Sequence, residues 1–246
     1  MKKIIVISFL MMSSISINAW SAIALDRTRV IYNGSEKSVS LNISNQNKEL
    51  PYLAQVWIED SNGNKINDPL TALPPLQRIE GGGKGQVKIQ GLNISQKLPQ
   101  DKESVFYLNL REIPPRSNKP NTLQIALQTR IKLFYRPKTL FADRSLLDNP
   151  WQKKISLKKE GGKVKVINPT PYYVTLAAVY NSIDGKPVNG FDPIMVEPKS
   201  SSYLTGKSSA LGSNPVLTFI NDFGGRPKLI FNCSANNCIV TDMKEG

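Results

Sequence analysis

The chain of 246 residues contains no histidine, two cysteines, and 19 acidic residues against 32 basic ones. The absence of histidine removes the most common general base, the serine triad in its usual form and most zinc sites. The acidic residues form no cluster that suggests a glycosidase pair or a calcium site. The glycine-rich run at 81–85 contains Lys84, but the Ser or Thr of a phosphate-binding loop does not follow it. We therefore expect a protein that is not an enzyme and that binds neither a metal nor a cofactor.

Beyond the first residues, the chain has no apolar run of the about 20 residues that a membrane-spanning helix needs. The exception lies at the start, where Lys2 and Lys3 precede an almost wholly apolar stretch from Ile4 to Met12. Small residues follow at Ala19 and Ser21. This order is typical of a secretory signal peptide, which we assign to residues 1–21, with the mature chain beginning at residue 22. We expect the mature protein to be soluble and exported.

The chain is strongly basic, with a formal charge of +13 that falls to +11 when Lys2 and Lys3 leave with the signal peptide. Such a charge fits nucleic acid, an acidic membrane surface or acidic protein partners. Nucleic acid is disfavoured because an exported protein rarely meets it, and because no basic motif interleaved with aromatic residues is present.

The two cysteines, Cys233 and Cys238, are an even count in an exported protein, which favours a disulfide. The four residues between them fit a bridge across a tight hairpin near the C-terminus. A redox-active pair is disfavoured because the spacing is not C-x-x-C.

Short runs of alternating apolar and polar residues recur along the chain, separated by clusters of Gly, Pro, Asn and Asp. Alternation is the period of a half-buried β-strand, and no amphipathic helix of convincing length interrupts it. The runs lie at residues 38–43, 52–58, 87–89, 105–110, 155–157, 164–166, 173–180, 194–196, 216–220 and 229–231. Because the pattern breaks at 138–150, we predict two β-sandwich domains, at 22–140 and 145–246.

The longest alternating segment is LQIALQTRIKLFYRP, residues 123–137. It is about twice the usual strand length of roughly 5–6 residues. Alternation of this kind usually marks the inner face of a sandwich, and that interpretation stays open from the residues alone. At a sheet edge, however, a long apolar strand invites another chain to pair with it. The segment then indicates a protein that lends a strand to a partner.

Six stretches of the sequence together resemble the periplasmic pilus-assembly chaperones. They are Leu25–Asn45, Leu50–Asp60, Phe106–Ser117, Leu123–Pro137, Asn168–Thr175 and Ile220–Pro227. The resemblance implies an all-β fold of two immunoglobulin-like domains set at an angle, like a boomerang. It implies a periplasmic protein that binds, folds and caps pilus subunits and delivers them to an outer-membrane usher. The alternative is a pilus subunit or adhesin, another exported β-protein.

By the same resemblance, the segment from Thr122 to Phe134 fills the gap in an incomplete subunit. Leu123, Ile125 and Leu127 are the expected groove-filling residues, whereas Ile131 and Leu133 are expected in the core of the chain itself. An exposed apolar edge also makes self-association of the free protein plausible.

Two groups of charged residues complete the site that the resemblance implies. Arg29 and Lys132 are expected to be exposed in a cleft and to bind the C-terminal carboxylate of the subunit, with Arg27 and Arg130 as flanking cations. Glu103, Arg136 and Asp222 match an interdomain charge network, which we expect to orient the domains rather than to stabilise them, because surface ion pairs are often worth little.

Overall fold

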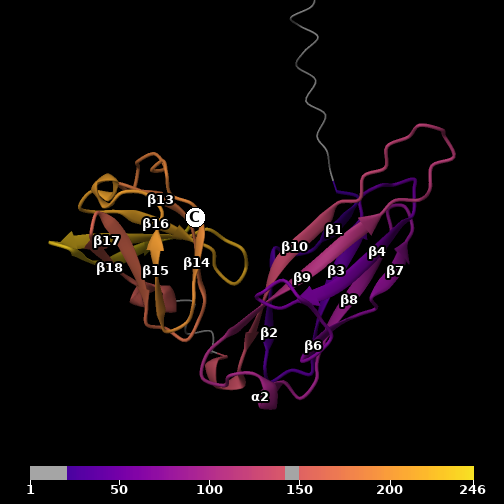
Figure 1. Ribbon diagram of the computed structural model, residues 1–246, viewed down its shortest axis with the longest axis horizontal. Helices are drawn as coiled ribbons and strands as arrows, with labels where there is room; N and C mark the ends of the chain where they lie inside the picture. The colour runs from indigo at the N-terminus through magenta and orange to yellow at the C-terminus, as the bar shows by residue number, and fades with distance from the viewer. Residues whose placement is uncertain (1–20, 142–149) are drawn as a thin grey trace, which may run out of the picture.

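The computed structural model describes residues 21–141 and 150–246, so most of the predicted signal peptide and much of the predicted linker lie outside the described residues. Two β-domains are set at an angle to one another (Figure 1). One core cluster draws its residues from Ile23 to Tyr135 and the other from Trp151 to Cys238. The predicted all-β fold of two sandwich domains at an angle is confirmed. The domain boundaries given above stay predictions.

The first domain is built from two sheets that face each other across one core. Its strands are β1 (Ile23–Leu25), β2 (Arg29–Asn33), β3 (Ser38–Asn45), β4 (Tyr52–Glu59), β5 (Lys65–Ile66), β6 (Leu70–Leu73), β7 (Leu76–Ile79), β8 (Lys84–Gly91), β9 (Ser104–Ile113) and β10 (Gln128–Arg136), with a short helix α2 (Ile94–Lys97). One sheet has the order β1-β3-β8-β6, and the other has the order β2-β10-β9-β4-β5 with β7 paired to β4. Leu41 and Val87 from the first sheet and Leu108 and Leu133 from the second are fully buried between them.

The second domain is a single sheet that curls around its own core. Its strands are β11 (Ser156–Glu160), β12 (Lys163–Asn168), β13 (Val174–Tyr180), β14 (Ile194–Val196), β15 (Ser200–Leu204), β16 (Val216–Phe219), β17 (Lys228–Ser234) and β18 (Asn237–Lys244). Short 3-10 helices span Lys138–Leu140, Trp151–Lys154 and Ser208–Leu211. The strand order is β14-β13-β16-β17-β18-β11-β12-β15. Because β14 and β15 are consecutive in the chain yet occupy opposite ends of the sheet, the sheet folds over itself.

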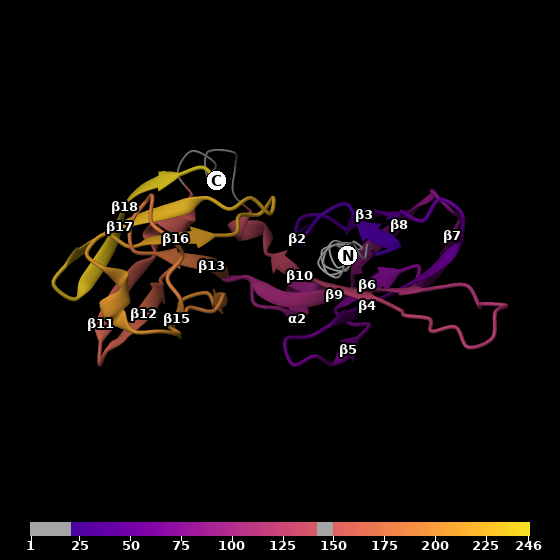
Figure 2. The same cartoon turned by 90° about the horizontal axis from the view of Figure 1, so that it is seen from above.

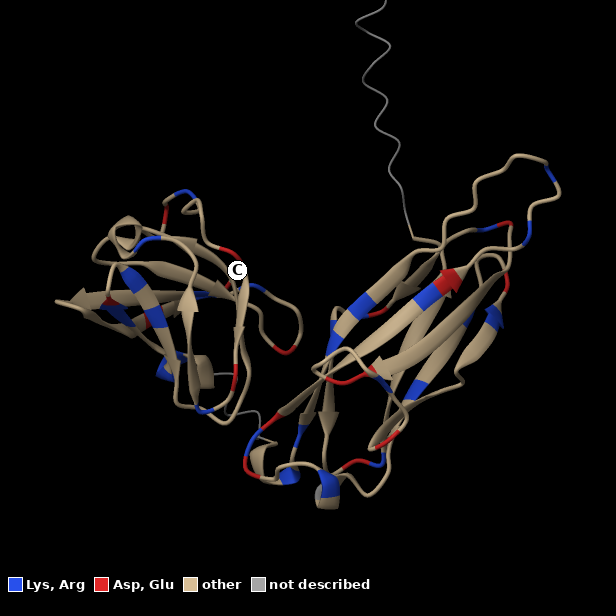
Figure 3. Cartoon of the chain, viewed as in Figure 1, with Lys and Arg blue, Asp and Glu red and all other residues tan. Residues whose placement is uncertain are grey.

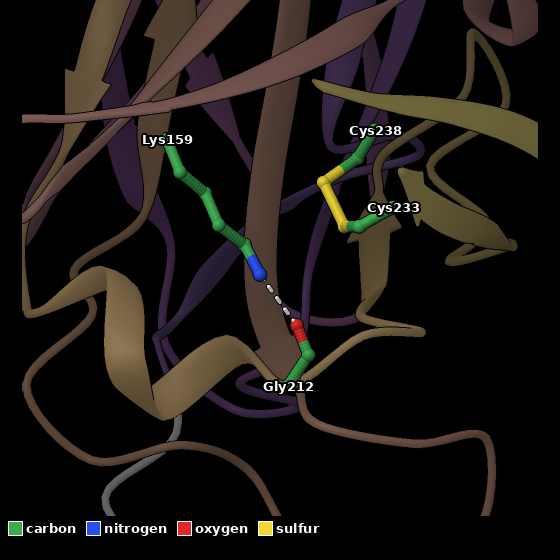
Figure 4. Close-up of a disulfide and its surroundings, with 4 residues drawn as sticks. All are labelled: Lys159, Gly212, Cys233 and Cys238. Carbon is green, nitrogen blue, oxygen red and sulfur yellow. Dashed lines mark hydrogen bonds between the residues drawn. A yellow bond between two sulfur atoms is a disulfide. The ribbon is translucent and has the colours of Figure 1, made fainter. Parts of the chain in front are cut away.

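The predicted disulfide joins Cys233 on β17 to Cys238 on β18 (Figure 4). The two cysteines are directly opposite one another in the hairpin register. Cys238 is buried in the second core. Beside the bridge, Lys159 Nζ donates a hydrogen bond of 2.7 Å to the carbonyl oxygen of Gly212. The bridge is therefore a local staple at the end of the last hairpin, as the sequence indicates.

Strand β10 begins at Gln128, whereas the alternating pattern predicts a strand from Leu123. Gln128 is opposite Arg111 at the last rung that β10 shares with β9. Residues 122–127 have no ladder partner in the described part of the chain, apart from one bond of 3.0 Å from Glu112 N to the carbonyl oxygen of Leu127. The prediction of a strand at 123–127 is wrong for the free chain, because a strand needs a neighbour as well as alternation.

Candidate functional site

The candidate site lies where the first domain meets the second. Figures 1 and 2 both place β2 and β10 on the side of the first domain that is nearest to the second domain. The two strands pair in parallel, with Lys132 opposite Arg29. Ile131, Leu133 and Tyr135 point into the first core, which confirms the prediction for Ile131 and Leu133. The alternate residues of β10 therefore face outward.

Arg29 is buried against the second domain rather than exposed as expected. Only 9% of its surface is accessible, and its Nη1 donates a hydrogen bond of 3.1 Å to the carbonyl oxygen of Ile220. Its buried Nε has no hydrogen-bond partner in the described part of the chain. Burial lowers the pKa of Arg29, and the charges of Asp222 and Glu103 oppose that change. The expectation of an exposed Arg29 is wrong because a carbonyl from far along the chain covers it.

Lys132, which was also expected to be exposed, is partly buried beside Arg29. Its Nζ lies 3.3 Å from Thr175 Oγ1, at the start of β13 in the second domain. Burial lowers the pKa of Lys132, and the positive charge of Arg29 lowers it further. Among the described residues, no salt bridge involves either Arg29 or Lys132. Two adjacent cations that are withdrawn from water and form no salt bridge are a site suited to a carboxylate.

A buried ion network crosses the domain junction next to these cations. Arg136 Nε donates to Glu103 Oε1 at 2.7 Å, and Arg136 Nη1 and Nη2 donate to the two carboxylate oxygens of Asp222 at 2.7 and 3.0 Å. The side chains of Arg136 and Glu103 are 8% and 2% exposed, and that of Asp222 is 34% exposed. Burial opposes the charge of Arg136, but the bonds and charges of Asp222 and Glu103 outweigh it and raise the pKa of Arg136. The Arg136–Glu103 pair is thus buried, unlike the surface pairs expected from the sequence.

Backbone bonds and a second ion pair also join the two domains. Glu103 N donates to the carbonyl oxygen of Pro171 at 2.9 Å, and Tyr173 N donates to Glu103 Oε2 at 2.8 Å. Lys199 Nζ contacts Asp101 Oδ2 at 2.6 Å on the surface. Glu103 therefore bonds to Arg136 in its own domain and to the backbone of the second domain, which fixes the network in one arrangement.

The three predicted groove-filling residues are exposed apolar side chains just before β10. Leu123, Ile125 and Leu127 are 84%, 64% and 40% exposed. Leaving such side chains in water forgoes about 1.5–3 kcal/mol each relative to full burial. The flanking cations are both held by carboxylates, Arg27 by Asp26 at 2.8 Å and Arg130 by Glu59 at 2.9 Å. The exposed apolar segment ends where β10 begins, and Lys132 lies on that same strand.

Sequence reasoning missed the second-domain groups that contact the two cations. These groups are the hydroxyl of Thr175 and the carbonyl oxygen of Ile220. A carbonyl group carries no sequence signal, and a single threonine in a strand is ordinary. Residues 21–141 and 150–246 contain no group of three or more metal-ligating side chains, and no helix in these ranges is long and apolar enough to cross a membrane.

The fold and this junction can be compared with known proteins. Residues 22–141 match the family model described as "Pili and flagellar-assembly chaperone, PapD N-terminal domain", and residues 150–231 match "Pili assembly chaperone PapD, C-terminal domain". The chain belongs to the family of pilus-assembly chaperones. A pilus subunit or adhesin, the alternative from the sequence, is not favoured.

Two named relatives make the likeness specific. The chain is 52% identical over 233 residues to the probable fimbrial chaperone YfcS of Escherichia coli K12, covering 95% of this chain and 91% of the relative. It is 48% identical over 225 residues to the chaperone protein PapD of Escherichia coli, covering 91% and 92%. A solved structure of the Salmonella enterica SafA pilin in complex with the SafB chaperone matches with a TM-score of 0.69 at 26% identity, covering 92% of this chain and 99% of that chain.

Proposed function

We propose that this protein is a periplasmic, non-enzymatic chaperone that binds a pilus subunit by lending it the segment 122–134 and by anchoring the subunit's C-terminal carboxylate at Arg29 and Lys132. One observation carries the proposal above the others. An exposed, alternating apolar segment runs along the chain into a pair of adjacent cations that form no salt bridge with any of the described residues. The SafB structure, a relative's complex with a pilin, supports the same class of partner.

The pairing of β2 sets the direction in which a subunit strand can bind. β2 pairs with β10 from Lys132 to Arg136, so the edge of β10 before Lys132 is free of β2. An incoming strand must therefore lie beside residues before Lys132. If its terminal carboxylate sits at Arg29 and Lys132, it runs parallel to β10. Ladder bonds then pair the backbones whatever the subunit sequence, while Leu123, Ile125 and Leu127 fill its groove.

The carboxylate anchor would set the register of that pairing. A guanidinium and an ammonium both donate charge-assisted hydrogen bonds to a carboxylate. A slip of one residue would turn every groove-filling side chain to the wrong face, so a fixed chain end is required. We infer that the buried Arg136 network holds the second domain so that Ile220 and Thr175 keep both cations in place.

The proposal also covers the location of the protein in the cell and the delivery of the bound subunit. The predicted signal peptide supports export to the periplasm, and delivery to an outer-membrane usher follows from the family resemblance. The exposed apolar segment also predicts pairing between two free copies, which sedimentation at rising protein concentration tests by a rise in mean mass.

Replacing groove-filling residues with glutamate tests strand donation. Leu123→Glu and Ile125→Glu are expected to weaken binding of a pilin about tenfold or more each, because each forfeits roughly 1.5–3 kcal/mol of burial. Both residues are exposed in the free chain, so the melting temperature of the free variants should stay near that of the parent. Isothermal titration with a purified pilin measures the affinity. Calorimetric melting measures the stability of the free variants.

The matched control is Gln124→Glu, which adds the same charge in the same segment at the alternate position. If Gln124→Glu weakens binding as much as Leu123→Glu, charge rather than groove filling explains the loss. A large fall in melting temperature for Leu123→Glu would instead place Leu123 in the core.

The lowered pKa of Lys132 predicts how anchoring depends on pH. In the free chain, burial and Arg29 hold this pKa below the ordinary lysine value of about 10.4. A carboxylate bound beside Lys132 raises the pKa again, so the complex keeps the proton to higher pH than the free chain does. Affinity for a C-terminal carboxylate should be full at pH values below the lowered pKa of free Lys132 and should fall as the pH rises through that pKa.

A synthetic peptide copying the last strand of a pilin measures this effect by fluorescence anisotropy across neutral and alkaline pH. The amidated form of the peptide and the Lys132→Met variant are the two controls, and both should show a flat profile. An equal decline for the free and amidated peptides would contradict the assignment of Lys132.

A further inference from the structure

The outer face of the first-domain sheet carries two more cations that lie in line with the proposed carboxylate anchor. Arg111 lies on β9 and Arg130 on β10, and both are exposed. Figure 3 shows basic segments on these two neighbouring strands, and the one on β9 lies near the C-terminal end of that strand, away from the second domain. Neither residue takes part in the core or in the domain junction described above.

The strand register places these cations on one face. Arg130 is two residues before Lys132 on the same strand, so their side chains point the same way, about 6.6 Å apart along the strand. Gln128, two residues earlier again, is directly opposite Arg111 on β9. Together with Arg29, which is opposite Lys132, these residues form a row of cations, defined here as Arg111, Arg130, Lys132 and Arg29.

Aromatic and acidic neighbours hold Arg111 and Arg130 in position. The Arg130 guanidinium lies 3.4 Å from the ring centre of Tyr107, and its Nε donates to Glu59 Oε2 at 2.9 Å. The Arg111 guanidinium lies 5.1 Å from the ring of Trp57. A stacked guanidinium has lost part of its rotational freedom already, so ordering it for a ligand costs less.

The row keeps an excess of positive charge. Within the ranges that the structure describes, the only salt bridge of the row is the one between Arg130 and Glu59. The four cations and the one carboxylate paired with them sum to +3, and the neighbouring network of Arg136, Glu103 and Asp222, whose carboxylates also act on Arg29, adds −1, so the surface keeps an excess of +2. Cations gathered on one surface raise the local concentration of an anionic partner and speed its association.

We propose that Arg111 and Arg130 recognise acidic side chains on the terminal strand of the subunit, in the residues just before its C-terminal carboxylate. This inference rests on the proposed function. A subunit strand that ends at Lys132 and runs parallel to β10 lies beside Arg130, and side chains on the same face of paired strands are near neighbours, about 5 Å apart. Arg111 is on β9, on the other side of β10 from that strand, so it acts at longer range than Arg130. Successive side chains of the subunit strand point to opposite faces. Acidic residues at every second position of that strand therefore face the cations, whereas those at the intervening positions face away.

A set of synthetic peptides tests the proposal by fluorescence anisotropy at low and high salt. One peptide carries glutamate at every second position before its C-terminus, a second carries glutamate at the intervening positions, and a third replaces every glutamate with glutamine. Each is made with a free and with an amidated C-terminus. Among the free peptides, one of the two glutamate peptides should bind about tenfold more tightly than the glutamine peptide at low salt, and the advantage should shrink at high salt.

Variants assign the effect to the two arginines. Arg130→Gln should reduce the affinity advantage of the glutamate peptide about threefold, and Arg111→Gln should reduce it by a smaller factor, while binding of the glutamine peptide stays unchanged. Arg130→Glu should reverse the preference toward a peptide with lysine in place of glutamate. The control Lys88→Gln removes an exposed cation from β8 in the opposite sheet and should change nothing. Melting temperatures establish that each variant is folded.

The outcomes separate this inference from the proposed function. If free and amidated peptides bind equally, the carboxylate anchor itself fails. If the free carboxylate matters but both glutamate peptides bind like the glutamine peptide, the anchor stands and the recognition by Arg111 and Arg130 is overturned. Equal enhancement by both glutamate peptides, or an equal loss in Lys88→Gln, would show attraction by net charge alone and would also overturn it.

Discussion

Replacing Lys132 with methionine and Arg29 with glutamine in one chain is expected to weaken binding of a pilin by about a hundredfold or more. Hydrogen bonds to a charged group contribute about 1.5–3 kcal/mol each, and roughly 1.4 kcal/mol corresponds to a tenfold change in affinity. The stability of the free protein should change little. Arg29 loses one bond to Ile220, but a buried Nε without a partner is removed as well, and the two effects oppose each other. Titration of purified protein with a pilin peptide measures the affinity.

The matched control for this double variant is Lys88→Met, which removes an exposed lysine from the opposite sheet of the same domain. It should bind the peptide like the parent. Normal recovery of complex with the double variant would contradict the anchor. A collapse in melting temperature would mean that Arg29 and Lys132 serve mainly to join the domains.

Arg136→Met is expected to lower the free energy of unfolding by about 3–5 kcal/mol, because it leaves the buried Glu103 carboxylate without its counter-ion. Asp222→Asn should cost less, about 1 kcal/mol, since a third of the Asp222 side chain is exposed and water can replace its partner. Urea unfolding followed by tryptophan fluorescence measures both. Trp57 lies in the first domain and Trp151 in the second, and replacing either with phenylalanine leaves a reporter for one domain in the mature chain.

The double variant Glu103→Leu with Arg136→Met is the control for that prediction. Removing both charges of a buried pair is often close to neutral, so the double variant should recover much of the stability that Arg136→Met loses. If Arg136→Met lowers the free energy of unfolding no more than Asp222→Asn does, the buried ion network does not stabilise the protein as its geometry indicates.

Much of the fold follows from alternation in the sequence. Runs such as 52–58 and 105–110 mark the core faces of β4 and β9, and both lie within observed strands. Short edge strands such as β5, with two residues, and β7, with four, carry too few residues to show a period. The alternation of 123–127 predicted a strand that the free chain does not form. Alternation reports which side chains share a face, and no strand within residues 21–141 and 150–246 lies beside 123–127 to complete a ladder.

The residues of the candidate site came from the sequence, whereas the burial of their side chains did not. The resemblance named Arg29 and Lys132, and the parallel pairing of β2 with β10 places them side by side. Their burial was not foreseen, because it depends on Ile220, which lies 191 residues beyond Arg29 in the chain. The same holds for Arg136, whose low exposure comes from the packing of the second domain over the end of β10. Local sequence carries the charge of a residue, whereas its solvation is set by contacts between domains.

Strand donation requires that residues 122–127 become a strand only when a subunit binds. Hydrogen–deuterium exchange on the free protein and on its one-to-one complex with a pilin measures this directly. We expect fast exchange of these amides in the free chain, where the described residues offer them no ladder partners, and strong protection in the complex. We also expect that Arg29→Gln with Lys132→Met abolishes that protection at matched concentrations. A stable complex in which the amides of 122–127 still exchange as fast as in the free protein would contradict strand donation.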